Sequence, residues 1–310
     1  MTREELKRLL VGPVATVPTP FDDDFEVDYG RMAAETRYWV ESGLVAGQAI
    51  IKVAAAMGEG PMLSDAEWPP LLRTVVQAAQ GQAAIVCGLH YKDTKRVIED
   101  AKRAQDLGAI GLQISPPIFN MPTHDDLLRY YEAISNAIDI GIMVYCHPWM
   151  EYGDIPAALI HRMADFEHVV AIKWAVGDPA DYDTMQTFSD IFNVIDNSGQ
   201  PVRCHRLGGR GYIAMTTEIY PPHDLQIWQL LEAKRYDEAQ ALFEPVNVAL
   251  RDFYNKTSVR SGGQARVKKG MAKLMGHPMG DSRPPSEPLN DEEMAELRQI
   301  LRGFGWPVVG

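Results

Sequence analysis

The chain has 310 residues, of which 46% are hydrophobic and 23% are charged, and its 42 acidic and 30 basic side chains give a formal net charge of −12. This composition is typical of a globular protein with one large α/β domain or two smaller domains. The negative charge excludes a surface built for nucleic acid or anionic lipid, because both require clustered lysines and arginines.

The apolar pattern predicts neither a signal peptide nor a membrane span, because the first residues are charged and no window approaches the roughly 20 apolar residues that cross a bilayer. Cys87, Cys146 and Cys204 are far apart and lie in no cluster with metal-ligand spacing. We therefore predict no disulfide framework and no metal site. We expect a cytoplasmic protein whose partner is a small molecule.

Short apolar runs alternate with longer amphipathic patterns along the first 225 residues. The runs predict strands at 14–17, 48–53, 83–89, 110–114, 141–146, 169–174, 192–195 and 212–215. The amphipathic patterns predict helices at 28–42, 64–79, 93–107 and 123–137, and four more at 225–232, 236–253, 264–274 and 291–304. Strands that are apolar on both faces and separated by helices indicate a parallel sheet covered on both sides. Eight such units favour a (β/α)8 TIM barrel over residues 1–225, with a C-terminal helical region, 226–310, packed on it.

In such a barrel the active site lies at the C-terminal ends of the strands. The run 169–174 places Val169, Ala171 and Lys173 on one face, so Lys173 would end a strand with small residues beneath it. A lysine buried there loses its charge readily, and a neutral amine is what Schiff-base chemistry on a carbonyl requires. The alternative is that Lys173 reaches solvent or pairs with an acid such as Asp178.

Tyr145 ends the neighbouring run, 141–146, and would enter the barrel mouth one strand away from Lys173. A phenol beside an amine can relay protons while a carbinolamine and an imine form and collapse. Taken alone, Tyr145 could equally be a rim residue with its hydroxyl in water. Lys52, at the end of the second run, is a rival amine without a tyrosine neighbour.

With Tyr145 and Lys173 on consecutive strands, the chain resembles the dihydrodipicolinate synthase and N-acetylneuraminate lyase superfamily from about Gly12 to about Leu301. The supporting motifs follow in order along the chain: Pro18-Thr19-Pro20-Phe21, Met57-Gly58-Glu59, Leu63-Ser64-x-x-Glu67, Pro116-Pro117-x-x-Asn120-x-Pro122, Tyr145, Ile172-Lys173, Gly177-Asp178, Gly211-Tyr212-Ile213, Lys268-Lys269-Gly270-Met271, Arg283-Pro284-Pro285 and Pro288-Leu289. The resemblance implies a homotetramer, or a dimer, with no cofactor beyond the lysine itself. It implies that Lys173 forms an imine with a 2-oxo acid such as pyruvate, that Tyr145 transfers the proton, and that Ile213 lies beside the substrate.

The sequence departs from the family pattern where the substrate would be held. Ala56 and Met57 occupy the positions of two threonines that bind the substrate carboxylate and share in the proton relay. Phe119 replaces a tyrosine contributed across a subunit interface, and Met150 stands where the synthases have an arginine for the aldehyde substrate. The resemblance therefore favours a relative of dihydrodipicolinate synthase and not that enzyme.

Several other residues are candidates for the missing substrate contacts. Arg203, His205, Arg206 and Arg210 form a basic cluster before the eighth strand, and we predict that Arg210 binds a carboxylate, although a solvated loop at a subunit contact is equally consistent. His147 and His90 could bind hydroxyls or could be structural histidines. Trp149 and Trp174 could line a pocket for an aromatic substituent or simply pack at the rim.

These features predict a Schiff-base lyase (aldolase or hydro-lyase) that acts on a 2-keto-3-deoxy acid or an aryl-substituted 2-oxo acid by aldol cleavage, condensation or dehydration. The predicted catalytic residues are Lys173 and Tyr145. Predicted substrate contacts are Ala56, Met57, Phe119, His147, Trp149, Arg210 and Ile213. Because both threonines are missing, a second hypothesis is a non-catalytic or regulatory binding protein on the same barrel.

Overall fold

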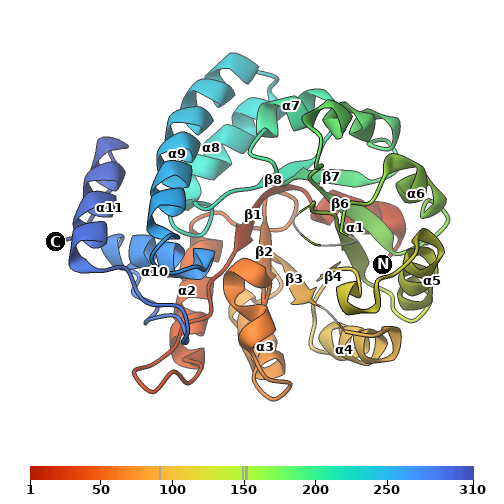
Figure 1. Cartoon of the computed structure of the whole chain (residues 1–310), viewed down its shortest axis with the longest axis horizontal. Helices are drawn as coiled ribbons and strands as arrows, with labels where there is room; N and C mark the ends of the chain where they lie inside the picture. Colours follow the sequence, from red (N-terminus) through yellow and green to blue (C-terminus); the bar gives the residue numbers. More distant parts are fainter. Residues whose placement is uncertain (91, 149, 151–152) are drawn as a thin grey trace.

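Eight parallel strands close into a barrel in chain order, each pairing with the next and β8 pairing with β1 (Figure 1). The computed structural model describes residues 1–90, 92–148, 150 and 153–310. The strands are β1 (Gly12–Thr16), β2 (Ile50–Val53), β3 (Ala84–Leu89), β4 (Gly111–Ile114), β5 (Gly141–Tyr145), β6 (Val169–Trp174), β7 (Asn193–Asp196) and β8 (Gly211–Ile213). The predicted (β/α)8 fold is confirmed, and every predicted strand is found within one or two residues of its expected bounds.

Helices surround the strands and form the outer layer (Figure 1). The α-helices are α1 (Arg3–Leu9), α2 (Tyr29–Glu41), α3 (Trp68–Ala79), α4 (Thr94–Asp106), α5 (His124–Ser135), α6 (Ala157–Arg162), α7 (Pro201–Arg206), α8 (Pro221–Glu232), α9 (Tyr236–Thr257), α10 (Gln264–Leu274) and α11 (Asp291–Gly303). The expected boundary between residues 225 and 226 falls inside α8, which packs on β1 as the eighth helix of the barrel. A division after Glu232 keeps that helix with the barrel and leaves α9–α11 as the extension.

The interior of the barrel is filled by apolar side chains from alternate positions of the strands, and Leu6 and Leu10 from the α1 region join this cluster. One detail of β6 differs from strict alternation. Val170 and Ala171 both belong to the interior cluster, whereas Val169 packs in the outer core. A register shift between β5 and β6 at Ile142 causes this change, because a bulge reverses the side on which the following residues point. The prediction that Val169 shares a face with Lys173 is therefore wrong.

Helix α3 begins later than expected. The Glu67 carboxylate accepts from the Ser64 amide at 2.8 Å, as a capping box requires, but the helix starts only at Trp68. The Trp68 amide donates to the Ser64 carbonyl at 3.3 Å, but Pro69 and Pro70 lack the amide hydrogens that would continue this turn to the carbonyls of Asp65 and Ala66. The prolines therefore move the first helical residue downstream of the expected Ser64.

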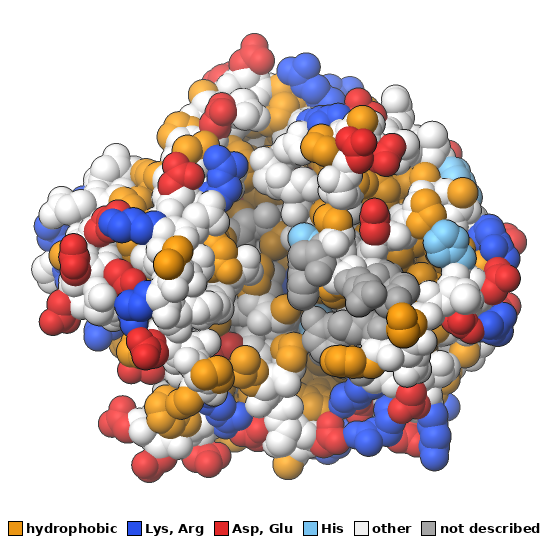
Figure 2. All heavy atoms as spheres, in the orientation of Figure 1, with side chains coloured by type: hydrophobic (Ala, Val, Ile, Leu, Met, Phe, Trp, Pro, Cys, Tyr) orange, Lys and Arg blue, Asp and Glu red, His pale blue; other side chains and the backbone are white. Residues whose placement is uncertain are grey.

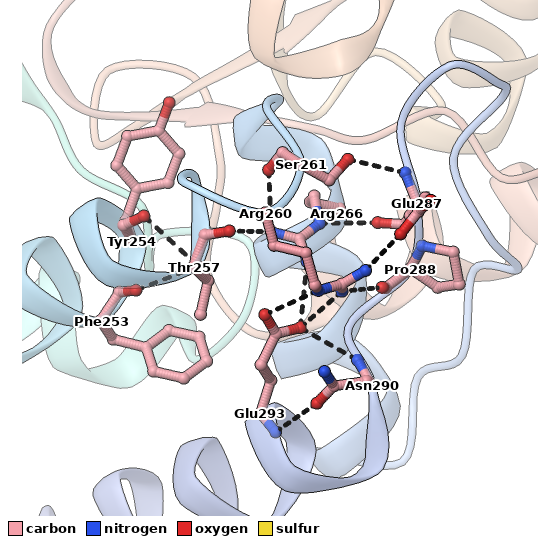
Figure 3. Close-up of polar contacts among 10 residues, drawn as sticks. All are labelled: Phe253, Tyr254, Thr257, Arg260, Ser261, Arg266, Glu287, Pro288, Asn290 and Glu293. Atoms are coloured by element: carbon pink, nitrogen blue, oxygen red, sulfur yellow. Dashed lines mark hydrogen bonds and ion pairs between the residues drawn. The ribbon is translucent and has the colours of Figure 1, made fainter.

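An ion cluster joins the three C-terminal helices (Figure 3). The buried Arg266 guanidinium on α10 contacts the Glu293 carboxylate at 3.0 Å and donates to the carbonyl of Thr257, the last residue of α9, at 3.2 Å. Arg260 contacts the same Glu293 carboxylate at 2.6 Å. Glu293 also completes a capping box with Asn290 at the start of α11. This cluster fixes the junction of α9 and α10, which carries Tyr254 and Gln264 to the barrel mouth.

Candidate active site

A cavity of about 380 Å³ opens at the C-terminal ends of the strands, on the face that Figure 2 shows hollowed near its centre. Its lining residues come from five strands, the loops that follow them and the C-terminal helices: Thr16, Lys52, Ala55, Ala56, Met57, Gln113, Tyr145, His147, Lys173, Asn197, Tyr254 and Gln264. None of these residues is an aspartate or a glutamate, although the chain carries a net charge of −12. The cavity therefore has an electrostatic character opposite to that of the chain, which suits an anionic ligand.

Lys173 and Tyr145 lie side by side at the cavity wall, because they are register partners on β6 and β5. The Lys173 Nζ atom lies 3.6 Å from the centroid of the Tyr145 ring. The imidazole rings of His90 and His147 pack edge-on against the Tyr145 ring, with centroid distances of 6.3 and 6.2 Å. The residues predicted to be catalytic are thus adjacent, and both histidines from the sequence analysis surround them.

Lys173 is only 5% exposed, and this burial is the main reason that its pKa lies well below the usual lysine value. The ammonium of Lys52 lowers the pKa further by charge repulsion. Burial and the charge of Lys173 also lower the pKa of His147 to about 4, and burial lowers the pKa of His90 to about 3. The site therefore holds two neutral imidazoles and a lysine whose amine is available as a nucleophile.

The floor of the cavity carries a second lysine. Lys52 Nζ donates to Gln113 Oε1 at 2.7 Å, and Thr16 is the register partner of Lys52 on β1. Burial is the main cause that lowers the pKa of Lys52 to about 7. Lys52, predicted as a rival amine to Lys173, lines the same cavity as Lys173.

The loop after β2 forms one wall and is held by polar contacts at its base. The Glu59 carboxylate pairs with the buried Lys269 ammonium at 2.8 Å, and the Thr19 hydroxyl donates to the Gly58 carbonyl at 2.6 Å. Ala56 and Met57 line the cavity from this loop, as predicted, but neither side chain offers a hydroxyl. Glu59 supports the loop and does not line the cavity.

Ile213 lines a second cavity of about 300 Å³ that adjoins the first. Met57, Asn197, Tyr254 and Gln264 line both cavities, so these four residues lie at the boundary between the two. The second cavity runs between the ends of β7 and β8 and the inner side of α9.

A model of the "Dihydrodipicolinate synthetase family" matches residues 9–303. The chain belongs to this family. It is 28% identical over 301 residues to a 4-hydroxy-tetrahydrodipicolinate synthase of Chlorobium limicola, covering 96% of this chain and 98% of that protein. It is 25% identical over 296 residues to the enzyme of the same name from Heliobacterium modesticaldum, covering 94% and 95%.

Solved structures of the family share the fold. A dihydrodipicolinate synthase from Acinetobacter baumannii in complex with pyruvate superimposes with a TM-score of 0.85 at 24% identity, covering 96% of this chain and 99% of that one. The synthase from Oceanobacillus iheyensis gives 0.84 at 21% identity, covering 98% and 99%. Family membership confirms the predicted enzyme class, a lyase that uses a lysine Schiff base and needs no external cofactor.

The basic cluster before β8 lies elsewhere. Arg210 precedes β8 and lines neither cavity; its guanidinium pairs with Glu232 at 2.9 Å. Arg203 pairs with Asp183 and His205 with Glu232. Because α7 precedes β8, the connection between them lies at the N-terminal end of the strands, opposite Lys173. The prediction that Arg210 binds the substrate carboxylate is contradicted, and the alternative of a paired surface cluster fits the structure.

The remaining candidates divide between the site and the surface. Phe119 is 82% exposed and lines neither cavity of the described residues. Trp174 is buried in the outer core, and its indole donates to the Tyr182 carbonyl at 3.1 Å, so it packs and does not contact substrate. Trp149 lies outside the described residues. Asp178 caps the following 3-10 segment by accepting from the Ala180 amide and forms no ion pair with Lys173.

Six lining residues were not predicted from the sequence: Thr16, Ala55, Gln113, Asn197, Tyr254 and Gln264. Thr16 and Gln113 each stand as the lone polar residue in an apolar strand, which is a signal that the sequence carried. Tyr254 and Gln264 reach the mouth from α9 and α10, and no local pattern indicates that placement. In the part of the chain that the structure describes, no cluster of three or more His, Cys, Asp or Glu side chains suits a metal ion, and no helix is long and apolar enough to cross a membrane.

Proposed function

We propose that this protein is a class I lyase in which Lys173 forms a Schiff base with a 2-oxo acid and Tyr145 transfers protons. The observation that carries the proposal is the buried Lys173 amine, held against the Tyr145 ring in a cavity whose described lining residues include no carboxylate. Burial lowers the pKa of this amine and so favours the neutral form, whose lone pair can attack the substrate carbonyl.

The reaction proceeds through covalent steps on Lys173. Nζ attacks C2 of the 2-oxo acid, the resulting carbinolamine loses water, and a protonated imine forms. Cleavage of the C3–C4 bond then sends the bonding electrons to the imine nitrogen, while the C4 hydroxyl loses its proton and an aldehyde departs. In the dehydration variant C3 loses a proton and the β-hydroxyl leaves as water. We assign the proton transfers to Tyr145, because its ring contacts Nζ.

We propose that the substrate differs from that of the dihydrodipicolinate synthases. Ala56 and Met57 supply no hydroxyls at the cavity wall, and Met150 is a buried thioether without charge. The second cavity, beside Ile213, favours a substrate with a chain beyond C3, such as a 2-keto-3-deoxy acid or an aryl-substituted 2-oxo acid. His147 lines the first cavity and is placed to bind a hydroxyl of such a substrate.

Borohydride trapping tests the proposal. The protein is incubated with pyruvate and longer 2-oxo acids, reduced, digested and mapped by mass spectrometry. We expect an adduct on Lys173 that is lost in Lys173→Ala. A protein that gains no adduct with any 2-oxo acid would contradict the proposal. Thermal stabilisation by those acids without an adduct would instead support the second hypothesis, a non-catalytic binding protein.

We further propose that the protein is cytoplasmic and forms a homotetramer or dimer. All three cysteines are free and buried, which fits a reducing compartment. Phe119 and Met121 are 82% and 67% exposed, and a pair of large apolar side chains on the surface is typical of an interface. Light scattering at several concentrations should show an oligomer that Phe119→Ser weakens; a monomer at all concentrations would contradict this.

A further inference from the structure

The cavity floor contains polar atoms that the proposed imine chemistry leaves unused. Thr16, Lys52 and Gln113 each are 1% exposed, yet each lines the cavity. Among the described residues, neither the Gln113 amide nitrogen (Nε2) nor the Thr16 hydroxyl has a hydrogen-bond partner. Buried polar groups without partners are costly and therefore uncommon, so their presence at a cavity floor indicates a ligand.

Lys52 is held at the cavity floor by a hydrogen bond to Gln113. Its ammonium donates to Gln113 Oε1 at 2.7 Å, which orients the amide so that the other end of the side chain, Nε2, remains a donor. Thr16 lies directly across from Lys52 in the β1–β2 register, and its carbonyl accepts from the buried Lys268 ammonium at 3.0 Å. Lys268 pairs with Glu218, so this neighbouring lysine is already neutralised. Within the described residues Lys52 forms no ion pair, and the carboxylate that raises its pKa from a distance, Glu218, is paired with Lys268.

The three groups supply the kinds of donor that one carboxylate accepts. A carboxylate has two oxygens with about four acceptor positions, and the floor offers an ammonium, an amide N–H and a hydroxyl. Lys173 lines the same cavity from β6, so an anion on the floor would keep its neighbouring carbonyl within that cavity. The β2 loop cannot take this role through its side chains, because Ala55, Ala56 and Met57 have no side-chain donors.

We propose that Lys52, Gln113 and Thr16 form the receptor for the carboxylate of the 2-oxo acid, replacing a loop-based contact by one inside the barrel. This inference rests on the proposed function, in that the bound carboxylate belongs to the molecule that reacts with Lys173. Lys52 then has a binding role and Lys173 the nucleophilic role, so the two amines are not interchangeable.

Imine trapping with two probes tests the receptor. Pyruvate carries the carboxylate, and pyruvamide presents the same ketone without the charge. Lys52→Met should raise the pyruvate concentration that gives half-maximal trapping by about 10- to 100-fold, the usual scale for a lost charge-assisted contact. The corresponding pyruvamide concentration should change by less than about threefold. Gln113→Glu, which is nearly isosteric, should show the same selective loss because its carboxylate would form an ion pair with the Lys52 ammonium. Arg210→Gln is the matched control outside the site and should change neither probe.

A pH profile separates binding from an effect on the nucleophile. Lys52 lowers the pKa of Lys173, so its removal also shifts the pH dependence of trapping. The two probes are therefore compared with each other at each pH, because both react with the same amine. Equal weakening of both probes at every pH would overturn the receptor. An adduct on Lys52 instead of Lys173 would overturn both proposals.

Failure of the proposed Schiff-base function can be distinguished from failure of the carboxylate receptor. If wild-type protein gives no adduct, calorimetric binding of pyruvate still reports on the floor, and Lys52→Met should weaken it to the same extent. Absence of that weakening would contradict the receptor. Circular dichroism of each variant confirms that the barrel is folded.

Discussion

Lys52→Met should make the protein more stable near neutral pH. Lys52 is fully buried, and its pKa falls from 10.5 to about 7 in the folded chain. At 1.36 kcal/mol per pH unit, folding at pH 7 therefore bears a cost of about 4 kcal/mol for this amine. Methionine fills similar volume without a polar group, but the substitution leaves Gln113 Oε1 without its donor, which costs about 1–3 kcal/mol. The net gain is about 1–3 kcal/mol.

The gain depends on pH with a defined sign. Between pH 7 and 10.5 the unfolded chain binds more protons at Lys52 than the folded chain, so the stability of the wild type rises with pH. Below pH 7 both states are protonated and the full cost remains; above 10.5 both are neutral and the cost disappears. The stability advantage of Lys52→Met should therefore be largest at and below pH 7 and decline by about 1.4 kcal/mol per pH unit above it.

Urea unfolding monitored by tryptophan fluorescence at pH 7, 8 and 9 measures this difference, with coincident circular dichroism transitions as the check on two-state behaviour. The double variant with Gln113→Leu removes the orphaned carbonyl and should gain more than the single variant at each pH. A Lys52→Met protein that is less stable at pH 7, or whose advantage is independent of pH, would refute the burial argument.

Three further outcomes are expected. Tyr145→Phe should slow exchange of the pyruvate methyl protons with D2O by about 10²- to 10⁴-fold, measured by NMR, while the final yield of reduced adduct stays unchanged; an unaltered rate would remove Tyr145 from the proton relay. Gly88→Ala should lower the free energy of unfolding by about 1–3 kcal/mol, because the new Cβ would lie 2.6 Å from the Ala54 carbonyl oxygen. Denaturant titration measures this loss, and an unchanged stability would contradict the close approach. Arg210→Gln should change stability by less than about 1 kcal/mol because its pair with Glu232 is exposed, and a larger loss would give that pair a structural role.

The strands could be predicted because a parallel sheet covered on both faces leaves a continuous apolar run in the sequence. The pairing of Tyr145 with Lys173 followed from counting residues to the ends of two neighbouring strands. Short helices had no comparable signal. Helix α7, Pro201–Arg206, has fewer than two turns, so no apolar period emerges from it, and its residues were interpreted as a loop.

That missing helix explains the error at Arg210. Loops that follow strands lie at the active end of a barrel, and loops that follow helices lie at the other end. Once α7 is recognised, the cluster Arg203–Arg210 must lie before β8 and far from the carboxyl ends. Basic residues on an acidic chain were a useful signal for an anion site, but the basic residues that line the cavity are Lys52 and Lys173.

The polar residues of the cavity floor carry a signal in the sequence that could have indicated the site. Thr16, Lys52 and Gln113 are each the lone polar side chain of a short apolar strand, on β1, β2 and β4. Each would be explained singly as a tolerated polar residue. Closure of the barrel brings these strands around one axis, and the three side chains line one cavity. A buried lysine that costs about 4 kcal/mol at neutral pH lies beside two donors that have no partner within the described residues. Stability alone does not explain this arrangement, whereas the proposed carboxylate contact does.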